Sequence, residues 1–287
     1  TTEQMTLERY LTGVVRGEMP ASFEMEALRA QAAAERSYVY YQLAAGRKDA
    51  HPDADFCTDH TCCSAYLSEA ARHHAGRVLR AVAGDPILVF DGAGHTAQGP
   101  IAFEGKDAWI TVETVAAPLK ESPVELTLIQ SFVNNDKADW IVEKAVETGV
   151  AHIVFVPAAR SITRLSGDKL EKRLARWQDI VIGACEQCGR NVLPSVTALS
   201  SLEAALKSVT ADVRWLMHPG ETSAPVLGNA KSVAFAVGPE GGFSEEEVAQ
   251  ARDAGWQCAV LGPRVLRTET AGLAAAVFLN TKLGDFF

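Results

Sequence analysis

The sequence has 287 residues, of which 47% are hydrophobic, a formal net charge of −9 and six irregularly spaced cysteines. A chain of this size can bury one or two ordinary cores, it has no run near the roughly 18 apolar residues of a membrane helix, and it has too few cysteines for the disulfide framework of a small secreted domain. Because the charge argues against indiscriminate phosphate binding and the first residues lack an export signal, the composition predicts a globular, cytoplasmic protein with reduced thiols.

The first 67 residues are expected to begin with helices and to end in a loop. Apolar residues recur at helical spacing from Leu7 to Val15, and residues 23–43 form a second, alanine-rich periodic stretch. Pro20 separates the two predicted helices. Residues 51–63 are rich in Asp, Thr, His and Cys, which is typical of a loop.

Three segments of this region carry a family resemblance. Tyr10 to Pro20, Glu26 to Ala32 and His51 to Cys63 resemble the start of the stage II sporulation protein D (SpoIID) domain, whose members are exported lytic transglycosylases. The resemblance implies that Glu18 stands where that family has its catalytic acid. It also implies a metal-binding stretch, here a candidate zinc set of His51, Cys57, Cys62 and Cys63, with Cys62 at a position that is usually His.

That resemblance stops near Tyr66, and most of the sporulation domain is absent. A peptidoglycan lytic enzyme therefore remains only an alternative function, and the chain is interpreted as chimeric. From residue 78 to 117, short β-rich runs at Ile87 to Phe90 and Ala108 to Val115 are broken by turn dipeptides such as Asp91-Gly92. We expect a small β domain over residues 71–121.

After Pro123 the pattern alternates between strand and helix. Strands are predicted at Leu126 to Phe132, Ile153 to Pro157, Val213 to Met217, Val233 to Val237 and Cys258 to Leu261, and helices at Lys137 to Thr148, Lys169 to Cys188, from Glu245, and from Thr270 to Leu283. This alternation is typical of a mostly parallel sheet with helices on both faces, over residues 122–287.

Two features between residues 160 and 190 allow two interpretations each. Cations outnumber anions there, which fits either an RNA-facing surface or a solvated helix face. Cys185 and Cys188 have the spacing of a redox or zinc half-site, but no second pair lies nearby, which favours cysteines that pack in the core.

The most informative segment runs from Ser232 to Glu247, an apolar strand that leads into Gly-Pro-Glu-Gly-Gly and then a helix. Ser244 and Glu247 have the spacing of a capping box, so the start of the helix is well specified. The glycines would let a ligand approach the backbone, and open α/β sheets bind ligands where strands end. The alternative is an ordinary strand-to-helix turn.

A second loop, Leu261 to Gly272, also follows a short strand and opens a helix whose first turns have small side chains. It contains a Gly-Pro dipeptide, two arginines, two threonines and a glutamate. Two such loops make a convergent polar site more plausible than two unrelated turns.

Five collinear motifs together resemble the RsmE family, the 16S rRNA uracil-N3 methyltransferases of the SPOUT superfamily. They are Arg72 to Arg80, Lys137 to Gly149, Glu186 to Arg190, Val237 to Ser244 and Leu261 to Ala271. The resemblance covers residues 71–287. It implies an α/β fold with a trefoil-knotted parallel sheet, preceded by a PUA-like RNA-binding β domain that is incomplete at its start, and a homodimer.

The resemblance also implies which residues bind. S-adenosylmethionine would lie against three strand ends, formed by Leu216, Met217, His218, Gly238, Pro239, Glu240, Gly241, Gly242, Leu261, Gly262, Leu266, Arg267, Thr268 and Thr270. The 16S rRNA of the small ribosomal subunit would be contacted by Arg72, His73, Arg77, Arg80, Arg160, Arg164, Arg173 and Arg190.

Methylation at N3 requires an imide nitrogen to lose its proton, so the reaction needs a base or a cation that stabilises the resulting anion. Arg267 is the candidate for the anion and Glu269 the candidate for the proton, because both stand at a helix start. Two alternatives remain open. Arg267 and Glu269 could simply pair with each other, or the chain could be a non-catalytic RNA-binding module of the same fold.

Overall fold

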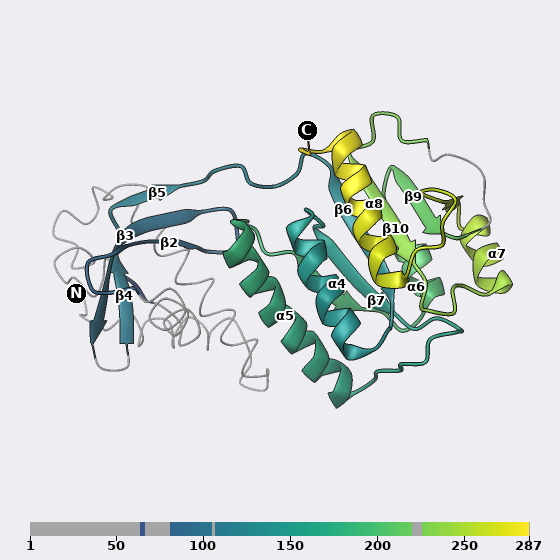
Figure 1. Ribbon diagram of the computed structural model, residues 1–287, viewed down its shortest axis with the longest axis horizontal. Helices are drawn as coiled ribbons and strands as arrows, with labels where there is room; N and C mark the ends of the chain where they lie inside the picture. The colour runs from purple at the N-terminus through teal and green to yellow at the C-terminus, as the bar shows by residue number, and fades with distance from the viewer. Residues whose placement is uncertain (1–63, 67–80, 105–106, 220–225, 287) are drawn as a thin grey trace, which may run out of the picture. The chain divides into compact units, whose positions relative to one another are not determined.

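The computed structural model describes residues 64–66, 81–104, 107–219 and 226–286, which belong to two compact units divided between Leu119 and Lys120 (Figure 1). The two helices predicted before residue 47 lie outside the described residues. None of the helices in these described ranges is long and apolar enough to span a membrane.

The first unit contains an antiparallel sheet. Its strands are β1 (Ser64–Tyr66), β2 (Pro86–Phe90), β3 (Thr96–Glu104), β4 (Asp107–Thr111) and β5 (Thr114–Ala116). The order is β1-β4-β3-β2, and β5 pairs with the first part of β3. The run predicted as one strand, Ala108 to Val115, is thus two strands, and β3 was not predicted as a separate element.

Packing in this sheet explains one glycine. Ile101, Ala108 and Ile110 form its buried core. A Cβ at Gly99 would lie 1.7 Å from the carbonyl oxygen of Thr111, so only glycine lets the backbone at the end of β4 approach β3 this closely. β1 pairs with β4 from Ser64↔Thr111 to Tyr66↔Trp109, so the sheet gains an edge strand from the end of the segment that resembles the sporulation family.

The second unit contains a parallel sheet with helices on both faces, as the alternating pattern predicted, but the sheet has six strands where five were predicted. Its strands are β6 (Glu125–Ser131), β7 (His152–Val156), β8 (Ser195–Ala198), β9 (Val213–Met217), β10 (Ser232–Val237) and β11 (Gln257–Ala259). The order is β11-β9-β10-β6-β7-β8. Its helices are α4 (Asn135–Glu147), α5 (Asp168–Cys188), α6 (Leu202–Ser208), α7 (Glu245–Asp253) and α8 (Thr268–Leu283).

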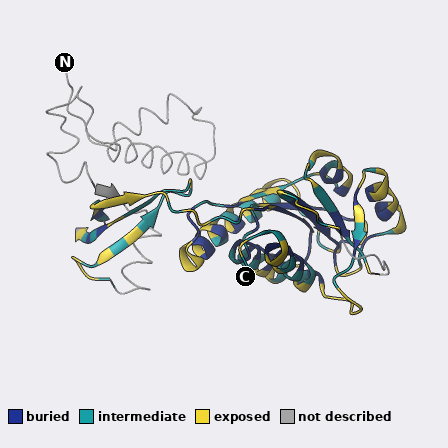
Figure 2. Cartoon of the chain, turned by 90° about the horizontal axis from the view of Figure 1, so that it is seen from above, coloured by how far each residue is buried: buried dark blue, intermediate teal, exposed yellow. Residues whose placement is uncertain are grey.

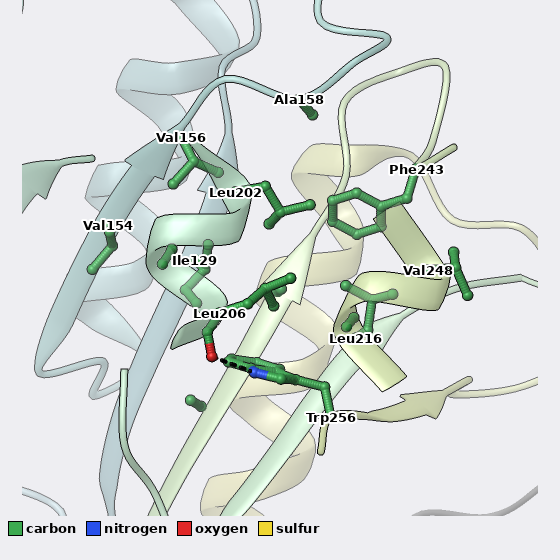
Figure 3. Close-up of a cluster of buried hydrophobic side chains, with 14 residues drawn as sticks. Ile129, Val154, Val156, Ala158, Leu202, Leu206, Leu216, Phe243, Val248 and Trp256 are labelled. Carbon is green, nitrogen blue, oxygen red and sulfur yellow. Dashed lines mark hydrogen bonds between the residues drawn. The ribbon is translucent and has the colours of Figure 1, made fainter. Parts of the chain in front are cut away.

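Helices cover both faces of this sheet, and Figure 2 shows buried strands between helices with exposed outer sides. On one face, α4, α5 and α8 cover residues such as Phe155, whose ring stacks on Trp177 of α5 at a centroid distance of 3.9 Å. On the other, α6 and α7 pack on Ile129, Val154 and Leu216 (Figure 3). The Nε1 of Trp256 donates to the carbonyl of Leu206 at 2.9 Å and so ties the segment after α7 to α6.

The last helix returns to the middle of the sheet. β11 is an edge strand, yet α8, which follows it, packs on central strands β10 and β6 and on α4. The start of α8 is thereby brought beside the loop after β10. The trefoil knot implied by the family resemblance stays a prediction.

Candidate functional site

A cavity of about 560 Å³ opens at the carboxyl ends of three parallel strands, within the range of small-molecule pockets. Met217, Val237 and Ala259, the last residues of β9, β10 and β11, all line it. Parallel strands place their carboxyl ends at one edge of a sheet, where open α/β folds bind ligands.

The loop after β10 is shaped by its glycines and held by its neighbours. Gly242 has a φ of +68°, a left-handed conformation that favours glycine, and its N–H donates to the carbonyl of Pro239 at 2.9 Å. The predicted capping box is present, with Ser244 and Glu247 bonding reciprocally. Glu247 also accepts from the N–H of Ala159 at 2.7 Å, and Arg160 donates to the carbonyl of Gly241 at 3.0 Å.

A buried relay of hydrogen bonds joins the two loops of the cavity. The Nε2 of Gln130, at the end of β6, donates to the hydroxyl of Thr268 at 3.0 Å, and this hydroxyl donates to the carbonyl of Gly238 at 2.6 Å. Sequence reasoning did not single out Gln130. A polar residue in the apolar run of β6 was the signal available, since buried polar groups need partners.

One polar atom in the cavity wall has no hydrogen-bond partner among the described residues. The Nδ1 of His218 is buried and forms no hydrogen bond among the described residues, while the backbone N–H of His218 donates to Ala259. An unpaired buried nitrogen costs free energy unless a ligand or water satisfies it. The apolar walls, glycine loops and free nitrogen therefore fit a nucleoside-type cofactor such as S-adenosylmethionine.

The charged groups of the site form a pattern that the sequence did not predict. Lys137 lines the cavity, and its Nζ lies 3.0 Å from Oε1 of Glu240 and 3.4 Å from Oε2 of Glu269. The hydrogen bond that Lys137 donates to Glu240 is the main reason that the pKa of Lys137 is raised, so the ammonium stays charged. Arg267 lines the cavity and is exposed, and within the described ranges it makes no ion pair with Glu269.

Glu269 does not line this cavity. Its carboxylate lies 3.4 Å from the ammonium of Lys137 and borders a separate, small groove between α4 and α8, which Trp140 and Leu273 also line. This position does not favour the predicted role of Glu269 as proton acceptor, and it removes the alternative in which Glu269 simply pairs with Arg267.

Most residues predicted to bind the cofactor converge on the cavity. Those that line it are Met217, His218, Gly238, Pro239, Glu240, Gly241, Gly242, Leu261, Leu266, Arg267 and Thr268. Leu216 packs into the core against the α6 and α7 layer, while Gly262 and Thr270 are exposed and outside the lining. Arg264 and Val265 also line the cavity; they lie within the predicted binding segment Leu261 to Thr270 but were not named as binding residues.

The residues predicted to contact RNA fall into four groups. Arg72, His73, Arg77 and Arg80 lie outside the described residues, whereas Arg160 and Arg164 are exposed in the segment between β7 and α5. Arg173 is paired with Asp139 at 3.3 Å. Arg190 is only 7% exposed and binds Glu121 and two backbone carbonyls, so the structure leaves it unavailable to RNA.

The predicted metal and lytic residues belong to the part of the chain before β1. Glu18 and the zinc candidates His51, Cys57, Cys62 and Cys63 lie outside the described residues, and in the described part of the chain no cluster of His, Cys, Asp or Glu could hold a metal. Burial raises the pKa of Cys185 to about 12, which keeps its thiol protonated and supports the packing interpretation for this cysteine. Cys188 is exposed, so the packing interpretation does not hold for the second member of the pair.

Three family models match successive parts of the chain. Residues 120–280 match the RNA methyltransferase domain family, residues 67–112 the RNA methyltransferase PUA domain, and residues 1–84 the stage II sporulation protein family. The sporulation match extends further than the resemblance near Tyr66 indicated and overlaps the PUA match over residues 67–84.

Relatives and solved structures point the same way. The chain is 30% identical to ribosomal RNA small subunit methyltransferase E of Bacillus subtilis over 226 residues, which cover 74% of this chain and 88% of the relative. It is 36% identical to a structure of ribosomal RNA small subunit methyltransferase E from Neisseria gonorrhoeae bound to S-adenosyl methionine (TM-score 0.71, covering 78% and 94% of the two chains). A methyltransferase from Legionella pneumophila with bound SAM is 31% identical (TM-score 0.72, covering 78% and 93%).

Proposed function

The chain belongs to the RNA methyltransferase family that includes ribosomal RNA small subunit methyltransferase E, and from this membership we propose that it transfers the methyl group of S-adenosylmethionine to N3 of a uracil in 16S rRNA. The observation that carries the proposal is the cavity at the ends of β9, β10 and β11. It combines glycine loops, apolar walls and the free Nδ1 of His218, in a chain that covers 94% of a relative solved with that cofactor.

The chemistry of the proposed reaction suits the charged rim of the cavity. The uracil N3 lies between two carbonyl groups, so its conjugate base spreads negative charge over both oxygens. Arg267 is exposed and stands directly before α8, so its guanidinium is free to approach one of these two carbonyl oxygens. S-adenosylmethionine supplies an electrophilic methyl, and fixed alignment of methyl and nitrogen contributes much of the rate.

The proposed partner is the small ribosomal subunit, which places the protein in the cytoplasm. Arg160, which donates to the glycine-rich loop, and Arg164 are both exposed in the segment between β7 and α5, and we assign phosphate contacts to them. A homodimer through α8 is also proposed, because this helix carries apolar side chains on all sides and exposes Val277. The zinc site of the first 67 residues stays a prediction.

Calorimetry of donor binding tests the site separately from catalysis. We expect saturable binding of S-adenosylmethionine to the full chain. His218→Ala should weaken it about fivefold, since one hydrogen bond contributes on the order of 1 kcal/mol. His152→Ala is the matched control, because His152 stands at the opposite end of the sheet, at the start of β7. A folded protein that gives no binding heat with millimolar donor would contradict the assignment.

A further inference from the structure

Lys137 occupies an unusual position for a lysine. It lies in the first turn of α4, where the helix dipole favours anions and disfavours cations. Departures from such local preferences concentrate at functional sites. Here the departure is compensated by two carboxylates from other parts of the chain, Glu240 after β10 and Glu269 in the first turn of α8.

The two carboxylates differ in what they face. Glu240 lines the cavity and is 37% exposed, and it is the one carboxylate among the described lining residues. Glu269 is 17% exposed and does not line the cavity, and its Oε2 lies 3.4 Å from the Nζ of Lys137 as an ion pair without a hydrogen bond among the described residues. Lys137 thus lies between a carboxylate that a substrate can reach and one that fixes its position.

We propose that Lys137 and Glu240 are the catalytic pair of the methyl transfer, with Glu240 accepting the N3 proton and Lys137 stabilising the resulting imide anion together with Arg267. This assignment rests on the proposed function. Two carbonyl oxygens flank N3, and three cations line the same cavity, Lys137 from α4 and Arg264 and Arg267 from the segment that leads into α8. Of these, Lys137 is the one paired with the cavity carboxylate, and Arg267 stands directly before α8.

The step balances without another reactant. The N3 proton moves to a carboxylate oxygen of Glu240, which becomes neutral and releases its hold on Lys137. The ammonium is then free to pair with the uracil oxygen that has gained charge. The N3 lone pair forms the bond to the methyl carbon, the sulfur–methyl bond breaks, and its electron pair stays on sulfur as a neutral thioether. Glu240 returns its proton to solvent.

The other titratable groups around the cavity do not replace this pair. His218 follows β9, and Arg264 and Arg267 precede α8; none of the three forms an ion pair with Glu240 in the described ranges, where Lys137 is the cation beside that carboxylate. Glu269 acts through Lys137 and is a positioning residue. Its loss should therefore cost less than the loss of either member of the pair.

Single-turnover methylation at saturating donor tests the pair. The substrate is small subunits reconstituted from transcribed 16S rRNA that contains either uridine or 5-fluorouridine. Lys137→Met and Glu240→Gln should each lower the rate at neutral pH by about 10²–10³-fold, with Lys137→Arg much closer to wild type. Because a cation favours the ionised imide, its removal should move the rising limb of the rate to higher pH. Fluorine makes the N3 proton more acidic, so 5-fluorouridine should reduce the deficit of both variants severalfold.

Lys144→Met is the matched control. Lys144 is on the same helix, is equally exposed at 27%, and also lies between two glutamates, Glu143 and Glu147. It should keep the wild-type rate and pH profile. Wild-type rates for Lys137→Met or Glu240→Gln, or a loss in them that neither alkaline pH nor 5-fluorouridine reduces, would overturn the pair while the function stands. Failure of the wild type to methylate would overturn both.

Discussion

Arg190 was predicted to contact RNA, but in the structure it is a buried residue that stabilises the fold. Its Nε donates to Glu121 at 3.1 Å, its Nη2 pairs with the same carboxylate, and its Nη1 donates to the carbonyls of Val146 and Val150 at 3.0 and 2.8 Å. The guanidinium thus joins the end of α4 to the segments before β6 and after α5. The charge excess of residues 160–190 could not distinguish it from Arg164, because burial depends on tertiary packing.

Replacing Arg190 by Met should therefore destabilise the second unit without affecting RNA contacts. Loss of one partner of a buried ion pair costs roughly 3–5 kcal/mol in free energy of unfolding. Chemical denaturation followed by the fluorescence of the buried Trp177 and Trp215 measures it. Arg164→Met should show the reverse, with wild-type stability and weaker, less salt-dependent RNA binding. Equal stability of the two variants would contradict this assignment.

At the scale of elements, local rules predicted the strand, loop and helix around the cavity. The boundaries of β9 and the start of α7 agree with those predicted, because an apolar run and the Ser244 capping box define them. β8 and α6 were missed, since a four-residue strand and a seven-residue helix give little periodicity. α8 begins at Thr268, two residues before the predicted start, because Thr268 is anchored by Gln130 from a distant strand.

The apolar circumference of α8 predicts a partner surface. Val277 is 38% exposed on this helix, and Trp140 on the neighbouring α4 is 37% exposed. Size exclusion with light scattering should give a dimer mass for the full chain, and Val277→Asp should shift it toward the monomer. Ile182→Asp on α5 is the control, with 37% exposure and no predicted interface. A monomeric wild type, or a dimer that survives Val277→Asp, would exclude α8 as the interface.

At the scale of the whole molecule, topology creates the charged site. In the sequence, Lys137 lies more than a hundred residues before both Glu240 and Glu269. The three side chains meet because β10 pairs with β6 and α8 returns to both strands. Sequence patterns identified the two loops and the parallel sheet, but not which side chains of α4 would reach them. The methyltransferase and sporulation matches show likewise that two family patterns coexist in one chain.

Methyl transfer to undermodified small ribosomal subunits tests the central claim most directly. The full chain, labelled S-adenosylmethionine and such subunits should yield label in 16S rRNA, and nucleoside analysis by mass spectrometry should identify it as N3-methyluridine. Subunits already methylated by a relative should accept none. Donor binding without any transfer to subunits would instead identify a non-catalytic RNA-binding protein and contradict the account.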